Sequence, residues 1–308
     1  PQPLRAPAPR RLSLVPPMDS RGRFAAELLT ATPRALAAAV ERQLEVAPVS
    51  VRCFGPDAFL RVLDDTETRL RYLAEAVAVG RPALFEHHVR WALEAHVGRE
   101  IPPEYLTENL SALRAACEGA LPDEAHRAVV PVLEAGRQRA LQGLQPTCSL
   151  LSGADPEVQL ARQFLLAVME GDADRAIEAV VDAARSGAHA PARLAEGVVA
   201  RALGEIGRMW QVGDASVADE HLCSRVAERA LAALAALTPR APRNGLRVAT
   251  FSIGGEMHEI GVRLVADAFS AAGWSVLHLG ANMPGEHLLQ ALRDPGIDLL
   301  AVAATLGL

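Results

Sequence analysis

The spacing of apolar residues changes once along this chain, and the change limits the folds it can adopt. From Pro33 to Leu237 apolar residues recur at steps of three and four, the period of helices packed on a core. Beyond residue 243, short apolar runs alternate with helical stretches, as in strands joined by helices in a parallel sheet. We predict a multidomain chain that is first all-α and then α/β.

The first helical block spans residues 33–144 and follows a Pro- and Arg-rich stretch, residues 1–24, that we expect to be a disordered tail. Pro131 is expected to break or kink the last helix of the block, because proline cannot donate to the preceding turn. The pattern predicts a compact all-α domain with these helical segments: Ala37–Leu44, Phe59–Val77, Leu84–Val97, Tyr105–Leu121 and Val129–Leu141.

A second helical block, residues 156–240, follows a linker at residues 145–155 that contains Pro, Ser and Gly. Glycine-containing turns divide it into four segments, and four helices with short connections predict a four-helix bundle. The segments are Val158–Met169, Ala173–Ala184, Pro191–Trp210 and Val217–Leu237.

Residues 246–308 alternate between strand and helix and predict a doubly wound parallel sheet of the Rossmann type. Such sheets normally have about five strands, and only three apolar runs are present, so we expect this domain to be incomplete at the carboxyl end. The expected strands are Leu246–Ile253, Ser275–Leu279 and Ile297–Ala304, with helices at His258–Ala272 and Gly285–Arg293.

Composition excludes several classes of protein. The sequence has no run of eighteen apolar residues, so it does not predict a transmembrane helix. The amino-terminal end lacks the pattern of a secretory signal. The net charge of −6 argues against a nucleic-acid partner. The cysteines are far apart in the sequence, which argues against disulfides and thiolate zinc sites and favours a cytoplasmic protein; they are Cys53, Cys117, Cys148 and Cys223.

The loop after the first predicted strand, residues 254–261, carries the clearest chemistry. The carboxyl ends of parallel strands face the ligand crevice of an open sheet, so His258 can bind a transition metal there through a ring nitrogen. Glu256 can accept a hydrogen bond from the other ring nitrogen, and Gly261 leaves space for a cofactor. The alternative is that His258 is an ordinary exposed loop residue.

A second group of residues that could bind a cofactor surrounds the turn between the last two bundle segments. Ser216 is expected to cap the fourth segment with Asp219 completing a capping box. In the simplest interpretation Trp210 belongs to the bundle core and the pair Glu220-His221 is solvated. That interpretation does not explain why an indole, a carboxylate and an imidazole gather at one end of the bundle.

Together these two groups resemble known cobalamin-binding proteins. The motif Glu256-x-His258-x-x-Gly261 behind a four-helix bundle resembles the cobalamin-binding module of corrinoid proteins. Trp210 followed after nine residues by Glu220-His221 is similar to the signature of CarH-type adenosylcobalamin photoreceptors. The resemblance covers residues 156–308 and lacks both the helix-turn-helix domain of that family and its C-terminal glycine-rich segment. Further matching positions are Leu279-Gly280, Pro284 and Thr305-Leu306.

The resemblance implies a light sensor rather than an enzyme. His258 would bind cobalt from below, Trp210 would cover the adenosyl group, and Glu220 would bind its ribose. Light would cleave the cobalt–carbon bond, His221 would take the upper axial position, and the chain would change its conformation or its state as a homo-oligomer, with an output domain or protein downstream. The implied cofactor-binding residues are Trp210, Val217, Glu220, His221, Glu256, Met257, His258, Glu259, Ile260, Gly261, Thr305 and Leu306.

The first helical block contains a second candidate site. An all-α domain of this size joined to a cobalamin photoreceptor module is similar to photocobilins, whose globin-like domain binds biliverdin. The alternative is that these are surface charges and a half-buried aromatic side chain, and that Cys53 is a free thiol rather than a bilin attachment point. The candidate contacts are His87, His88, Trp91 and His96, with Tyr72, Tyr105, Asp64, Asp65, Arg52, Arg69, Arg71, Arg90 and Arg99.

Two other functions remain open for the second half of the chain. A corrinoid methyl carrier of a methyltransferase system would share the bundle and the His258 loop. It would have no evident use for Trp210 and Glu220-His221 over the upper face, where a methyl acceptor must reach cobalt. A regulatory domain that binds haem or a small signal in the same cleft would not require His258 as a ligand.

Overall fold

The computed structural model describes residues 20–44, 53, 58–144, 148–285 and 296–305. The chain divides into two compact units, and each is treated by itself below. Unit 1 comprises residues 1–92 and 102–143, and unit 2 comprises residues 93–101 and 144–308. Within the described ranges, no helix has both the length and the apolar character that crossing a membrane requires.

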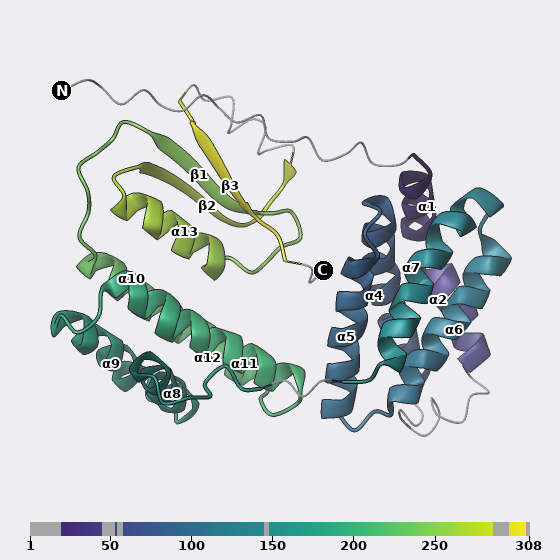
Figure 1. Cartoon of the computed structure of the whole chain (residues 1–308), viewed down its shortest axis with the longest axis horizontal. Helices are drawn as coiled ribbons and strands as arrows, with labels where there is room; N and C mark the ends of the chain where they lie inside the picture. Colours follow the sequence, from purple (N-terminus) through teal and green to yellow (C-terminus); the bar gives the residue numbers. More distant parts are fainter. Residues whose placement is uncertain (1–19, 45–52, 54–57, 145–147, 286–295, 306–308) are drawn as a thin grey trace. The chain divides into compact units, whose positions relative to one another are not determined.

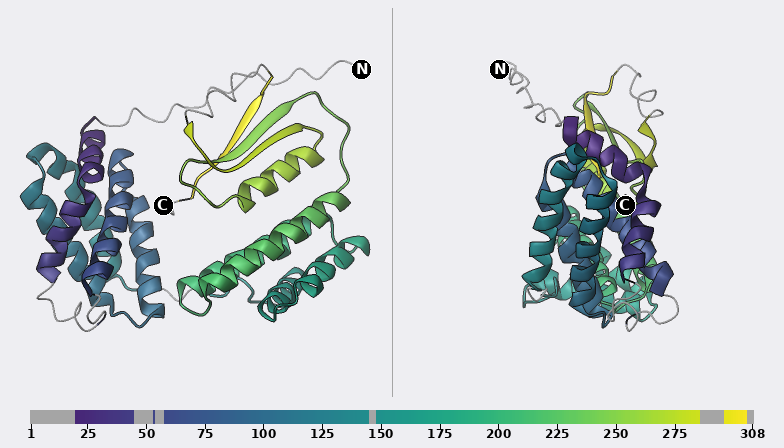
Figure 2. Two further views of the ribbon diagram at one scale, coloured as in Figure 1. Left: turned by 180° about the vertical axis from the view of Figure 1, so that it is seen from behind. Right: turned by 90° about the vertical axis from the view of Figure 1, so that its right-hand side faces the viewer.

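Unit 1 is all-helical, as predicted, and its helices pack side by side (Figures 1 and 2). Neighbouring pairs include α1 with α4, α2 with α6, and α6 with α7. Each helix buries one apolar stripe, which is the outcome that spacing by three and four predicts. The helices are α1 (Ser20–Ala31), α2 (Pro33–Leu44), α4 (Ala58–Ala78), α5 (Pro82–Gly98), α6 (Pro103–Ala120) and α7 (Asp123–Leu141).

Two details of unit 1 differ from the sequence predictions. Helix α1 begins at Ser20, so residues 20–24 are helical rather than part of a tail, and Ala25 and Leu29 become fully buried. Pro131 lies inside α7 without breaking it. Proline costs a helix one hydrogen bond, and packing of the buried side chains around it, including Val129 and Val132, offsets that loss.

The first part of unit 2 is a helical bundle whose segments match the predicted ones closely. The third predicted segment is one helical run with a π-helical section, η2, between two α-helical parts. Its interior is a continuous cluster of buried side chains that includes Phe164, Ile206 and Leu231. The elements are α8 (Pro156–Met169), α9 (Ala173–Arg185), α10 (Pro191–Leu194), η2 (Ala195–Ala200), α11 (Arg201–Gln211) and α12 (Val217–Leu237).

The second part of unit 2 is a three-stranded parallel sheet in the order β2-β1-β3. The strands are β1 (Arg247–Ile253), β2 (Ser275–Met283) and β3 (Leu299–Ala303), and helix α13 (Ile260–Ala271) lies along one face of the sheet (Figure 1). The helix predicted at Gly285–Arg293 falls almost entirely outside the described residues. The Rossmann-like pattern is therefore confirmed, and the doubly wound form stays a prediction.

Packing of α13 on the bundle brings the two sequence motifs toward the same end of unit 2. Ile260 and Leu264 of α13 pack against the core of the bundle. The carboxyl ends of both helices line one small cavity, with Thr238 on one side and Ala271 on the other. The two helices therefore run in the same direction. The segment before α12 contains Trp210 and the segment before α13 contains His258, so both lie toward the same end of unit 2.

Candidate functional site

The loop between β1 and α13 holds His258 by two hydrogen bonds to one carboxylate. Oε1 of Glu256 lies 2.6 Å from the His258 ring nitrogen Nδ1 and accepts a second hydrogen bond from the His258 backbone N–H at 2.7 Å. The hydroxyl of Ser252, in β1, donates to the His258 carbonyl at 3.0 Å. The ring and the backbone of His258 are thus both tied to the carboxyl end of the central strand.

Glu256 is only 1% exposed, yet its carboxylate remains charged. Burial by itself raises the pKa of Glu256, but hydrogen bonds from Thr305 and from the His258 backbone outweigh burial and lower the pKa to about 2. Thr305, which follows β3, donates to Oε2 from its backbone N–H at 2.6 Å and also from its hydroxyl. The carboxylate therefore joins the ends of β1 and β3.

This arrangement fixes which nitrogen of His258 is free to bind a metal. An ionised carboxylate can only accept hydrogen bonds, so in the neutral imidazole Nδ1 carries the proton and Nε2 has the lone pair. The His258 side chain is 72% exposed and is therefore accessible to a ligand. The described residues contain no cluster of three or more His, Cys, Asp or Glu side chains that could hold a metal ion. A metal that already carries an equatorial ring of nitrogens needs only one such imidazole, and His258 fits that requirement.

One residue that the sequence analysis missed, Asn282, supports this loop from β2. Asn282 adopts a left-handed backbone conformation (φ 53°), accepts the Gly255 N–H on its side-chain oxygen at 2.8 Å, and donates its own N–H to the Glu256 carbonyl at 2.9 Å. Glu259 accepts the N–H of Ala281 at 3.1 Å. The enrichment of Asn among residues with positive φ is the one local signal for Asn282.

The turn between α11 and α12 has the cap that the sequence predicts. Ser216 and Asp219 exchange both hydrogen bonds of a capping box, which fixes the start of α12. One turn into the helix, Glu220 Oε2 lies 2.8 Å from the His221 ring nitrogen Nδ1, and Glu220 Oε1 accepts the hydroxyl of Ser224 at 2.8 Å. The His221 side chain is 73% exposed, so its other ring nitrogen is accessible.

Trp210 is half-buried and lies outside the bundle's core cluster, so the simplest interpretation of this residue as core is wrong. Val217 and Met257 are exposed, and a Cβ added to Gly261 would meet nothing within 4 Å, which leaves open space there. Ile260 instead packs on the bundle. Leu306 lies outside the described residues. The cofactor roles of these residues stay predictions.

Some of the polar residues of unit 1 that the sequence analysis named as candidate bilin contacts are buried. His88 is 4% exposed and stacks on Tyr72 with ring centroids 3.8 Å apart. Arg69 is 2% exposed, lies 3.6 Å from Asp65 and donates to Asn109. The surface interpretation is wrong for these two and holds for the exposed His87, Asp64 and Arg71, whereas Arg52 lies outside the described residues.

Asp65 also accepts a hydrogen bond from the hydroxyl of Tyr105 at 3.3 Å. Burial raises the pKa of Tyr105, so this phenol keeps its proton and acts as the donor. The ring of Tyr105 lies under Arg69, with the guanidinium carbon 5.8 Å from the ring centroid. These contacts are internal to the helices of unit 1 and do not themselves indicate a bound pigment.

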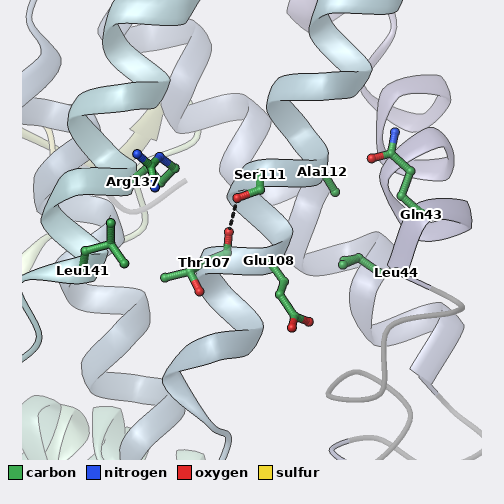
Figure 3. A pocket seen from close by; sticks show the side chains of 8 residues that line it. All are labelled: Gln43, Leu44, Thr107, Glu108, Ser111, Ala112, Arg137 and Leu141. Carbon is green, nitrogen blue, oxygen red and sulfur yellow. Dashed lines mark hydrogen bonds between the residues drawn. The ribbon is translucent and has the colours of Figure 1, made fainter.

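A cavity of about 490 Å³ lies between α2, α6 and α7 of unit 1 (Figure 3). It contains none of the predicted site residues. On α6, beside the cavity, the Ser111 hydroxyl donates a hydrogen bond to the carbonyl of Thr107 one turn earlier, at 2.8 Å. Its lining is Gln43, Leu44, Thr107, Glu108, Ser111, Ala112, Arg137 and Leu141. The residues of the His258 loop belong to the other unit.

Comparison with known protein families adds an independent observation. Residues 160–235, which form most of the bundle, match a family model described as a B12 binding domain. Residues 246–307 match a second model with the same description. The second half of this chain is supported as a cobalamin-binding region. The matched segments contain Trp210, Glu220, His221, Glu256 and His258.

Similar proteins are known from two organisms. A corrinoid protein of Desulfitobacterium hafniense (strain Y51) is 24% identical over 156 residues, which are 48% of this chain and 70% of that protein. The methanol:cobalamin methyltransferase complex of Methanosarcina barkeri aligns at 20% identity and a TM-score of 0.30, over 62% of this chain and 69% of that one. A cobalamin-binding protein of D. hafniense DCB-2 aligns at 18% identity and a TM-score of 0.28, over 47% and 68%.

Proposed function

We propose that this chain is a corrinoid protein in which His258 is the lower axial ligand of cobalt. The observation that carries the proposal is the contact between Glu256 Oε1 and His258 Nδ1, which directs the other nitrogen of an exposed ring, Nε2, to the metal. The carboxylate holds the orientation of the imidazole. Bound cobalamin supplies a cobalt–carbon bond, which can deliver a methyl group or be cleaved by light.

Of the two uses of that bond, a methyl carrier is the one that the named relatives support. The sequence relative is a corrinoid protein, and none of the similar proteins above is described as a photoreceptor. In this function the chain would carry the group between partner methyltransferases and would catalyse no reaction alone. His258 would hold the cofactor, and the exposed space beside Gly261 would receive its lower face.

A light sensor that binds adenosylcobalamin is the second candidate. The observation in its favour is the contact between Glu220 and His221, which gives the bundle a second exposed imidazole. This imidazole is near the start of α12, toward the same end of unit 2 as the His258 loop. A carrier has no evident use for such a group. In this function light would alter the association state of the chain as a homo-oligomer.

One comparison separates the two functions. The full chain is loaded in the dark with adenosylcobalamin, illuminated with green light, and followed by absorbance and size-exclusion chromatography beside a His221→Ala variant. A sensor gives different illuminated spectra for the two proteins and a light-dependent change in the association state of the wild type. Identical spectra and an unchanged association state eliminate the sensor and leave the carrier.

For unit 1 we propose biliverdin as a second chromophore, in keeping with the sensor. The support is the all-helical fold and the stacking of the buried His88 ring with Tyr72 and, at 6.3 Å between ring centroids, with Trp91. Adding biliverdin to the purified chain should produce a red-absorbing band that His88→Ala weakens. If no band appears, unit 1 has no bilin role.

A further inference from the structure

Arg99 binds the end of the helix that carries Trp210. Residues 93–101, the last turn of α5 and the turn after it, cluster with unit 2. The Arg99 guanidinium donates to the backbone oxygen of Trp210 at 2.9 Å and to that of Gln211. Its central carbon also lies 5.8 Å from the centroid of a Trp210 ring. The Arg99 side chain, which the sequence analysis named as a candidate bilin contact, is thus engaged with α11.

A second contact reinforces the first. The side-chain amide of Gln211 donates to Oε2 of Glu94 at 2.8 Å, and Glu94 is only 7% exposed. A Cβ at Gly98 would lie 2.3 Å from the backbone oxygen of Val212, so this approach of two backbones requires glycine. The last carbonyls of a helix lack partners within the helix. Residues of α5 and its following turn supply partners to two of those carbonyls and to the side chain of Gln211.

We propose that Arg99 is a positioning residue that holds Trp210 in place and ties it to α5. Two hydrogen bonds fix the end of α11, and a cation near the indole ring restricts how the ring can turn. The part of the proposal that concerns cobalamin rests on the proposed function. The contact between Arg99 and Trp210 itself does not.

The Arg99 contact joins the end of α11 to the carboxyl-terminal end of α5 within unit 2. Helix α5 runs without interruption from Pro82 to Gly98, so its first part belongs to unit 1 and its end to unit 2. His88 and Trp91 lie on it about two to three turns before Arg99.

The first test uses the protein without cobalamin. The chain has three tryptophans, so Trp91→Phe and Trp274→Phe leave Trp210 as the single fluorophore. In that background Arg99→Gln should raise acrylamide quenching of Trp210 about twofold, as expected for loss of a half-exposed cation–π contact and two hydrogen bonds. Arg99→Lys, which keeps the charge near the ring, should restore part of the protection.

Arg81→Gln is the matched control, because Arg81 is an exposed arginine at the opposite end of α5. It should leave the quenching unchanged. Thermal unfolding followed by circular dichroism confirms that each variant is folded. Equal quenching of the single-tryptophan protein with and without Arg99→Gln would overturn the proposal, and so would an equal effect of Arg81→Gln.

The second test uses the chain loaded with adenosylcobalamin in the dark. Arg99→Gln should release the cofactor about threefold faster, the factor that one contact of this kind contributes. In a Trp210→Phe background the same change should have a clearly smaller effect, because the two residues act as a pair. Fully additive effects would contradict the proposal. If the wild type binds no cobalamin, the proposed function fails while the quenching result still decides the role of Arg99.

Discussion

At the scale of single residues, the central pair is Glu256 and His258. The sequence analysis predicted this contact from spacing alone, because a carboxylate two residues before a histidine in a tight loop can reach Nδ1. It did not predict that Thr305 bonds the same carboxylate, because residues 49 positions apart meet only through the parallel pairing of β1 with β3. Thr305 was named only because of the resemblance to a known family, and the sequence analysis did not name Asn282.

Replacing Glu256 by Gln tests how the carboxylate acts. The amide keeps the size of the side chain but loses the charge and presents an N–H₂ group, so His258 loses its fixed tautomer. We expect cobalamin affinity to fall about tenfold or more, as for other groups that orient a metal ligand. Spectrophotometric titration measures the change. His221→Ala, the control, should bind cobalamin in the dark as the wild type does. Unchanged affinity of Glu256→Gln would refute the orienting role.

Replacing Thr305 tests the hydrogen bond that its hydroxyl donates to the Glu256 carboxylate. Thr305→Val removes the hydroxyl that donates to Glu256 and keeps the branched shape, while the backbone N–H continues to donate. One lost hydrogen bond to a buried charged group costs about 1.5–3 kcal/mol. We therefore expect a lower free energy of unfolding for unit 2, measured by urea titration, and a rise in the pKa of Glu256. A variant as stable as the wild type would contradict the hydrogen bond.

At the scale of elements, the sequence placed nearly every helix and strand of the described residues, with boundaries shifted by a few positions. The periodic segments were long enough that packing and local preference agreed. The disagreements arose where long-range packing decides: α1 extends into the expected tail because its apolar face is buried, and α7 continues through Pro131 for the same reason. The π-helical section η2 has no signature in the periodicity.

The capping box of α12 gives a prediction at this scale. Ser216→Ala removes the hydroxyl that accepts the Asp219 N–H and should cost about 1 kcal/mol of stability, the usual contribution of an N-cap. The variant should also loosen the turn that precedes Glu220-His221. Urea unfolding of the full chain measures the cost. Ser270→Ala, inside α13, removes a hydroxyl without affecting a cap and should cost less. Equal losses for both variants would speak against the cap.

At the scale of the whole molecule, the sequence anticipated one all-helical block, one bundle and one parallel sheet in that order. It did not anticipate that the end of α5 would cluster with the second unit, because the contacts of Glu94 and Arg99 with α11 span more than a hundred residues. No local pattern encodes such a pairing. The spatial relation of the His258 loop to the α12 end was likewise accessible only from the packing of α13 on the bundle.

Cobalamin should stabilise the two units unequally. A ligand that binds only the folded form at a hundred times its Kd adds about 2.7 kcal/mol, and the proposed contacts all lie in unit 2. Calorimetry with and without cobalamin should show a higher Tm for unit 2. The fluorescence of single-tryptophan variants assigns the transitions, with Trp91 reporting on unit 1 and Trp274 on unit 2. A shift confined to unit 1 would place the cofactor elsewhere.

The most direct measurement of the central claim is the identity of the nitrogen below cobalt. The chain is produced with ¹⁵N-labelled histidine, loaded with unlabelled cobalamin, reduced to the paramagnetic Co(II) state and examined by electron paramagnetic resonance. We predict that the axial nitrogen splitting changes from the triplet of ¹⁴N to the doublet of ¹⁵N, and that His258→Ala abolishes the doublet. A triplet that persists in the labelled protein would mean that the cofactor's own benzimidazole occupies the position, and it would contradict the account.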